Sequence, residues 1–170
     1  MDWLLILLRL IHIVLGAAWV GMMVMNVAFL MPTLRDAGPA AGPVMAGLQR
    51  RKFMVVTPVI ALLTIGSGAW LMMRVWGGAD GLMASRPGQT YTAGATLAIV
   101  AFVIGITVMR PAMMRAGALA QAMGTVQNDA ERATRMAELE RLRTRGAVAG
   151  RLVTVLLLLA TAAMAVARYV

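Results

Sequence analysis

Four long apolar stretches constrain the fold of this chain more than any other feature of its sequence. Crossing about 30 Å of hydrocarbon takes about 20 helical residues, and four stretches are long enough for this, at residues 3–31, 53–75, 91–109 and 147–167. Backbone polar groups in lipid must be bonded within the protein, and an open chain meets that demand only with helices. The sequence therefore predicts an all-α integral membrane four-helix bundle, a single transmembrane domain over residues 1–170.

The composition agrees with a lipid environment and excludes several kinds of chemistry. Hydrophobic residues make up 61% of the chain, whereas soluble domains hold about 45–50%. Cysteine is absent, which excludes disulfides, thiolate metal sites and iron–sulfur clusters. The net charge of +9 comes without a basic soluble module that bears aromatic residues. We therefore expect the lipid bilayer as partner, and no nucleic acid.

The charge of the connections predicts how the chain is oriented in the membrane. The first connection carries Arg50, Arg51 and Lys52, and the third, residues 110–145, carries seven arginines against four acids. The second connection holds little charge. Because Lys and Arg gather in short cytoplasmic loops, we expect the first and third connections in the cytoplasm. Both termini then lie outside, in a multi-pass protein of the bacterial inner (cytoplasmic) membrane.

The third connection has the pattern of a helix rather than a loop. Asn128 followed by Glu131 resembles a capping box, and Glu131 with Arg135 is an i,i+4 pair of opposite charges. We expect a helix of about 40 residues, roughly 60 Å long, from Asn128 into the fourth span. The charged segment 112–145 thus predicts cytoplasmic extensions of the third and fourth helices, with a turn at Gly124. We interpret it as a solvated surface; a docking surface for a cytoplasmic partner is the alternative.

The first span carries a line of polar and aromatic residues along one side. At 100° per residue, Arg9, His12, Trp19 and Asn26 fall within an arc of roughly 100°. His12 is the only histidine and lies nine residues after Trp3, about 14 Å deeper along the helix axis. An ionisable group near the middle of a bilayer costs a few kcal/mol and needs a partner. We therefore predict that His12 faces the bundle interior, with the other three residues on the same side.

Two interpretations of His12 stay open on spacing alone. Imidazole suits haem iron and copper, so His12 is a candidate metal ligand, with Gly16 leaving room for a flat ring and Arg9 pairing with a propionate. Alternatively, His12 is a hydrogen-bond donor that bridges helices, with Thr57, Thr64 or Asn26 as acceptor.

The remaining spans limit the available chemistry. All seven acids lie outside the spans, so the carboxylate proton relay of ion-coupled transporters is missing. One histidine per chain cannot form a bis-histidine haem site, which leaves His–Met, five-coordinate His, or a site shared across a homo-oligomer. Met109 and Met113 form a helical pair that suits Cu(I), although methionine is more often packing filler. Pro58 in the second span predicts a kink near Thr57 or Met54.

The second span, "RRKFMVVTPVIALLTIGSG", resembles the second helix of HemJ-type protoporphyrinogen oxidases. The shared elements are a basic pair, Thr-Pro, Thr and Gly, here Arg50–Arg51, Thr57–Pro58, Thr64 and Gly66. The first span is similar to the His…Trp…Gly pattern of that family, here His12, Trp19 and Gly21. The same pattern resembles CopD-like copper-resistance membrane domains and their small bacterial relatives. The resemblance covers residues 1–75.

The resemblance implies a b-type haem linked to His12, with redox or electron transfer as the function. The candidate cofactor site then comprises His12 as the metal ligand, with Arg9, Trp19, Asn26 and Thr57 around it. The third stretch, "GQTYTAGATLAIVAFVIG", lacks the His and Lys of the family's third-helix motif, so the resemblance supports the fold more than the oxidase activity. The alternatives are a cofactor-free accessory or assembly subunit that packs against other membrane subunits, and copper handling.

Overall fold

The computed structural model describes residues 2–76, 85–125 and 128–170, and within these ranges the chain forms helices and no strand. In the described part of the chain, four helical rods are long and apolar enough to cross a membrane: Trp3–Asp36, Phe53–Val75, Arg86–Ala122 and Asp129–Tyr169. The predicted all-α class and the four potential spans are confirmed. Each rod contains one of the apolar stretches of the sequence, and three of them continue well beyond it.

The rods are built from consecutive helices. The first consists of α1 (Trp3–Met25), the π-helical turn η1 (Asn26–Leu30) and α2 (Met31–Asp36). A 3-10 turn (Gly38–Ala40) leads to α3 (Ala41–Arg50) and then to α4 (Phe53–Trp76). The third rod consists of α5 (Arg86–Ile104), the π-helical turn η3 (Gly105–Met109) and α6 (Arg110–Ala122), and a 3-10 turn (Met123–Thr125) follows it. The last rod is α7 (Asp129–Val166) with a terminal 3-10 turn (Ala167–Tyr169).

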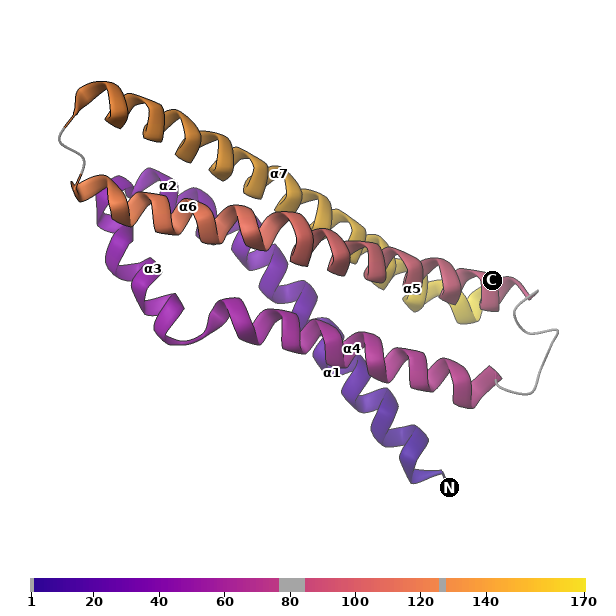
Figure 1. The fold of residues 1–170 in the computed structure, drawn as a ribbon. Helices are drawn as coiled ribbons and strands as arrows, with labels where there is room; N and C mark the ends of the chain where they lie inside the picture. The colour runs from indigo at the N-terminus through magenta and orange to yellow at the C-terminus, as the bar shows by residue number, and fades with distance from the viewer. Residues whose placement is uncertain (1, 77–84, 126–127) are drawn as a thin grey trace.

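The rods associate as two helical pairs. α1 packs against α4, α5 packs against α7, and these are the most extensive helix contacts in the described chain. Figure 1 shows α5 and α6 running alongside α7, whereas α1 crosses α4 obliquely and its N-terminal end points away from the other helices. The His12 region of α1 therefore belongs to the α1–α4 pair.

The two pairs meet in a small core. Its buried residues are at most 4% exposed and come from all four rods: Trp19, Met23, Ala61, Ala101, Val153 and Leu157. The Trp19 ring packs edge-on against Phe102, with ring centroids 6.4 Å apart, a favourable aromatic geometry. Alanines at the contact let helix backbones approach closely, as is usual between helices in membranes. This core places the Trp19 side of α1 inside the bundle.

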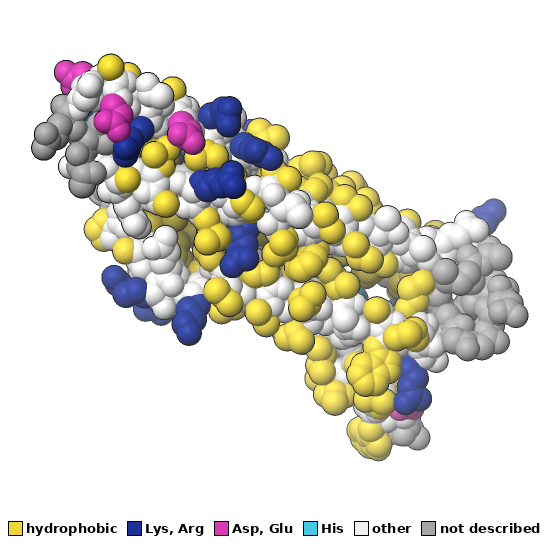
Figure 2. Space-filling view, viewed as in Figure 1, with side chains coloured by type: hydrophobic (Ala, Val, Ile, Leu, Met, Phe, Trp, Pro, Cys, Tyr) yellow, Lys and Arg dark blue, Asp and Glu magenta, His cyan; other side chains and the backbone are white. Residues whose placement is uncertain are grey.

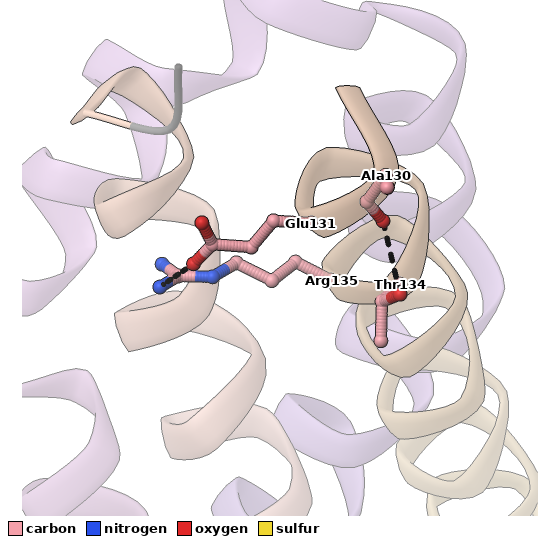
Figure 3. Close-up of polar contacts among 4 residues, drawn as sticks. All are labelled: Ala130, Glu131, Thr134 and Arg135. Carbon is pink, nitrogen blue, oxygen red and sulfur yellow. Dashed lines mark hydrogen bonds and ion pairs between the residues drawn. The ribbon is translucent and has the colours of Figure 1, made fainter. Parts of the chain in front are cut away.

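The long fourth rod begins as the sequence predicts. The Asn128 side chain accepts a hydrogen bond from the Ala130 N–H at 2.9 Å, and α7 runs for 38 residues from there. Figure 3 shows the first turns, where Arg135 donates to the Glu131 carboxylate and the Thr134 hydroxyl donates to the Ala130 carbonyl. The predicted turn at Gly124 also forms, within the 3-10 turn that follows the third rod. These predictions are confirmed because they depend on residues within one or two helical turns.

The charged segment is only partly a solvated surface. Leu139 and Leu142 of α7 are buried against Ala116 of α6, so the two extensions share a second core. On the face drawn in Figure 2, most charged side chains lie over the end where α3, α6 and the start of α7 meet, and apolar side chains cover the middle. An ion pair of 3.4 Å between Arg35 and Glu140 links this end to the first rod.

The second span continues through its proline. α4 is helical from Phe53 to Trp76 with Pro58 inside it, and the Thr57 hydroxyl donates to the Phe53 carbonyl at 3.0 Å. Proline has no N–H, so residue 58 gives no backbone hydrogen bond to the carbonyl of Met54. The helix is not interrupted there, and the kink near Pro58 stays a prediction.

Candidate functional site

His12 lies half-buried on α1, facing α4. Its Nδ1 is 2.9 Å from the carbonyl oxygen of Thr64. A carbonyl oxygen only accepts hydrogen bonds, so Nδ1 is the donor in this contact. In the neutral imidazole this tautomer leaves the lone pair on Nε2. One hydrogen bond between helices therefore sets both the orientation of the ring and the nitrogen that is free to act as acceptor or ligand.

The imidazole fits against α4 because residue 68 is glycine. A Cβ at Gly68 would lie 2.7 Å from Cε1 and 3.0 Å from Nδ1 of His12. Gly16, the residue expected to leave room for a flat ring, has a different neighbour. A Cβ at Gly16 would meet the Thr64 methyl at 3.5 Å, an ordinary contact. The space for the ring is thus provided by Gly68 on the partner helix, not by Gly16 on the same helix as His12.

The acceptor carbonyl belongs to a small polar cluster between α1 and α4. The single proton of the Ser67 hydroxyl is shared between the Leu63 carbonyl at 2.7 Å and the Thr64 carbonyl at 3.0 Å. The Thr64 hydroxyl donates to the Ile60 carbonyl at 2.9 Å. Thr64 and Ser67 are buried, at 7% and 8% exposed, and both hydroxyls have acceptors. The cluster presents to His12 a carbonyl that is held in place by its own helix.

Gly68→Ala is expected to displace the His12 ring, because the added methyl would overlap Cε1. Overpacking of this kind lowers the free energy of unfolding by about 1–3 kcal/mol. Gly66→Ala is the matched control, since a Cβ at Gly66 meets nothing within 4 Å and both variants share the gain in helix propensity. Thermal unfolding in detergent compares them. Equal melting temperatures would contradict the close approach of His12 to Gly68.

Arg9 does not lie on the interior side, and this part of the prediction is wrong. Arg9 is exposed, whereas Leu8 beside it is buried at 7% exposed. The buried face of α1 continues from Leu8 through His12 to Trp19, and Arg9 lies at the edge of the predicted arc. Among the described residues Arg9 has no hydrogen-bond or ion-pair partner. Its long side chain is free to extend toward lipid headgroups.

Trp19 and Asn26 are on the interior side with His12, as predicted, but at other levels. They are 4% and 5% exposed, and they lie 7 and 14 residues beyond His12, about 10 and 21 Å along the helix axis. Asn26 begins the π-helical turn η1, and its buried Oδ1 accepts no hydrogen bond from the described chain. Thr57 lies seven residues from Thr64, and its hydroxyl is bonded within α4. The structure therefore joins His12 to Thr64, not to these three residues.

The methionine pair serves packing against α7. Met109 and Met113 lie against two glycines of α7, Gly150 and Gly146. If these glycines carried a Cβ, it would be 3.5 Å from the Met109 sulfur and 3.3 Å from Met113 Cγ, respectively. A Cγ atom of Val27 would lie 3.3 Å from the same Cβ at Gly150. Met109 and Val27 therefore contact α7 at the same height along the bundle. That level is 15 residues from His12, about 22 Å along the axis. Met109 and His12 are too far apart to share one copper ion.

Gly68 and Ser67 are the site residues that sequence reasoning missed. The signal for them was the small-residue run Gly66-Ser67-Gly68 inside an apolar helix, since small residues mark close approaches between membrane helices. Comparisons with protein-family models, curated proteins and solved structures find no match to this chain. The function is therefore inferred from the geometry of His12 and its neighbours.

Proposed function

We propose that this chain is a small bacterial inner-membrane protein of the HemJ/CopD-like group that binds one b-type haem through Nε2 of His12, for redox or electron transfer. The observation that carries the proposal is the hydrogen bond from His12 Nδ1 to the Thr64 carbonyl. Histidines that bind metals almost always donate their other ring N–H to a carboxylate, a carbonyl or water, which fixes the ring and raises the basicity of the ligating nitrogen. Thr64 fills this supporting role here.

The surroundings of His12 fit a haem ligand. The ring is seated in the space left by the missing Cβ of Gly68, is only partly buried, and makes no hydrogen bond through Nε2 to the described chain. Arg9 lies three residues before His12 and is exposed, and in the proposed complex its guanidinium would reach past the edge of the α1–α4 contact to pair with a propionate. A bound haem would supply one-electron chemistry. Because the third-helix His and Lys of HemJ-type enzymes are missing, we propose electron transfer rather than the oxidase reaction.

An absorption spectrum of the protein purified from a haem-producing bacterial host tests the proposal. We expect a Soret band, visible bands that change on reduction, and about one haem per chain, as one histidine ligand implies. Haemin added to the purified protein provides a second route to loading if the host supplies too little. A protein that stays free of haem by both routes would refute the proposal.

A cofactor-free accessory or assembly subunit is the second candidate, and the same hydrogen bond favours it. The Thr64 carbonyl gives the membrane-buried imidazole a partner without any cofactor. This role is expected to give a spectrum without a Soret band and co-purification with other membrane subunits or a second copy of the chain. Copper handling, the remaining alternative, gains no support from Met109 and Met113, which pack against α7.

The proposed orientation places both termini outside and the first and third connections in the cytoplasm. The physical reason is the concentration of Arg50, Arg51, Lys52 and the arginines of residues 110–145 on those connections. Reporter fusions at Gly38 and Gly124, which lie in the turns of these connections, are expected to be active in the cytoplasm. Periplasmic signals at both positions would overturn the orientation.

A further inference from the structure

A groove of about 860 Å³ runs along one face of α7, away from the His12 site. The groove is largely open to its surroundings rather than enclosed by the protein. One end is apolar and is lined by Ile104 and Val108 of the third rod and by Val148 and Leu152 of α7. These residues belong to the apolar stretches of the third and fourth rods. This end of the groove therefore offers a surface to an acyl chain.

The other end of the groove is formed by residues whose side chains end in charged or polar groups. Arg141, Thr144 and Arg145 line it, about one to three turns before Val148 and Leu152 of the same helix. Glu140 also lines it, and its carboxylate is paired with Arg35 at 3.4 Å. With that acid paired, Arg141 and Arg145 are the basic residues at this end, and neither has an ion-pair partner in the described part of the chain. Arginine is well suited to phosphate, because its guanidinium offers paired N–H donors.

We propose that this groove binds an anionic phospholipid, with its phosphate at Arg141 and Arg145 and an acyl chain against Val148 and Leu152. The charged end of the groove matches the headgroup of such a lipid, and the apolar end matches its acyl chain. The change from charged to apolar residues falls where the fourth span begins, near residue 147. Basic pockets between helices on the cytoplasmic side are a known mode of binding anionic headgroups. The inference rests on the membrane placement proposed above and is independent of haem.

The test measures lipid binding to the delipidated full chain in detergent by native mass spectrometry. Phosphatidylglycerol is expected to bind more tightly than phosphatidylcholine, because only the former carries net negative charge. The double variant R141Q/R145Q is expected to lose the preference, with affinity for phosphatidylglycerol reduced about tenfold or more. R115Q/R143Q removes the same charge from exposed positions outside the groove and is expected to bind as the wild type does.

Two further measurements test the contribution of the acyl chain separately from that of the phosphate. Val148→Trp fills the apolar end while keeping both arginines, and it is expected to weaken binding of phosphatidylglycerol. Inorganic phosphate is expected not to compete, because it lacks the acyl chain. Equal binding of the two lipids, equal losses in R141Q/R145Q and R115Q/R143Q, or displacement by phosphate would each overturn the proposal. The proposal would also be overturned if a partner protein, and not a lipid, occupied the groove. None of these readouts depends on a Soret band.

Discussion

His12→Asn is expected to abolish haem binding and to lower the stability of the haem-free protein less than His12→Ala does. The asparagine amide N–H takes the place of Nδ1 and donates to the Thr64 carbonyl, while nothing replaces Nε2. His12→Ala is expected to remove haem as well, and also to lower the free energy of unfolding by about 1–2 kcal/mol, since a hydrogen bond and part of a packed ring are lost. The fold stays largely intact, because the Trp19 core does not include His12.

Haem content and thermal unfolding, measured on both variants, separate the two roles of His12. Retention of haem by His12→Asn would refute ligation through Nε2. If the wild type never carries haem, and His12→Ala is destabilised more than His12→Asn, then His12 is a structural bridge between α1 and α4. Equal stability of His12→Ala and the wild type would argue against the bridge, because the Thr64 contact would then contribute nothing measurable.

Gly94→Leu is expected to produce the largest loss of stability of any substitution considered. A Cβ at Gly94 would lie 3.2 Å from the Ala160 carbonyl oxygen and 3.1 Å from Met164 Cγ. Met164 is flexible and can move, but the carbonyl is part of the α7 backbone, so a larger side chain must push α5 and α7 apart. We expect a loss of about 3 kcal/mol or more, at the upper end of overpacking costs.

Ala93→Leu is the control for this prediction, because Ala93 is exposed on the same helix, one residue away. It is expected to leave the melting temperature close to that of the wild type. Thermal unfolding of both variants in the same detergent makes the comparison. Similar melting temperatures for Gly94→Leu and Ala93→Leu would show that the α5–α7 contact tolerates separation.

The sequence by itself determined the features that depend on a single segment. Four apolar stretches predicted four long helices, and the cap at Asn128, the Glu131–Arg135 pair and the turn at Gly124 follow from residues within a turn or two of each other. Such signals are local, so no knowledge of the other helices is needed to read them. The placement of Trp19 and Asn26 on the same side of α1 as His12 was also correct, because these residues lie within the arc that α1 buries.

Only the tertiary structure decided which atoms meet at His12. Its partner is a backbone carbonyl, which side-chain identity does not encode, and Gly68 rather than Gly16 provides the space for the ring. Arg9 falls outside the buried face because the rotation of α1 is set by its contacts with α4 and with the core. Lipid tails are as apolar as the side chains between helices, so hydrophobicity does not mark the packed side of a membrane helix. Rotation and axial offset are decided by close packing of side chains, which exists only in the assembled bundle.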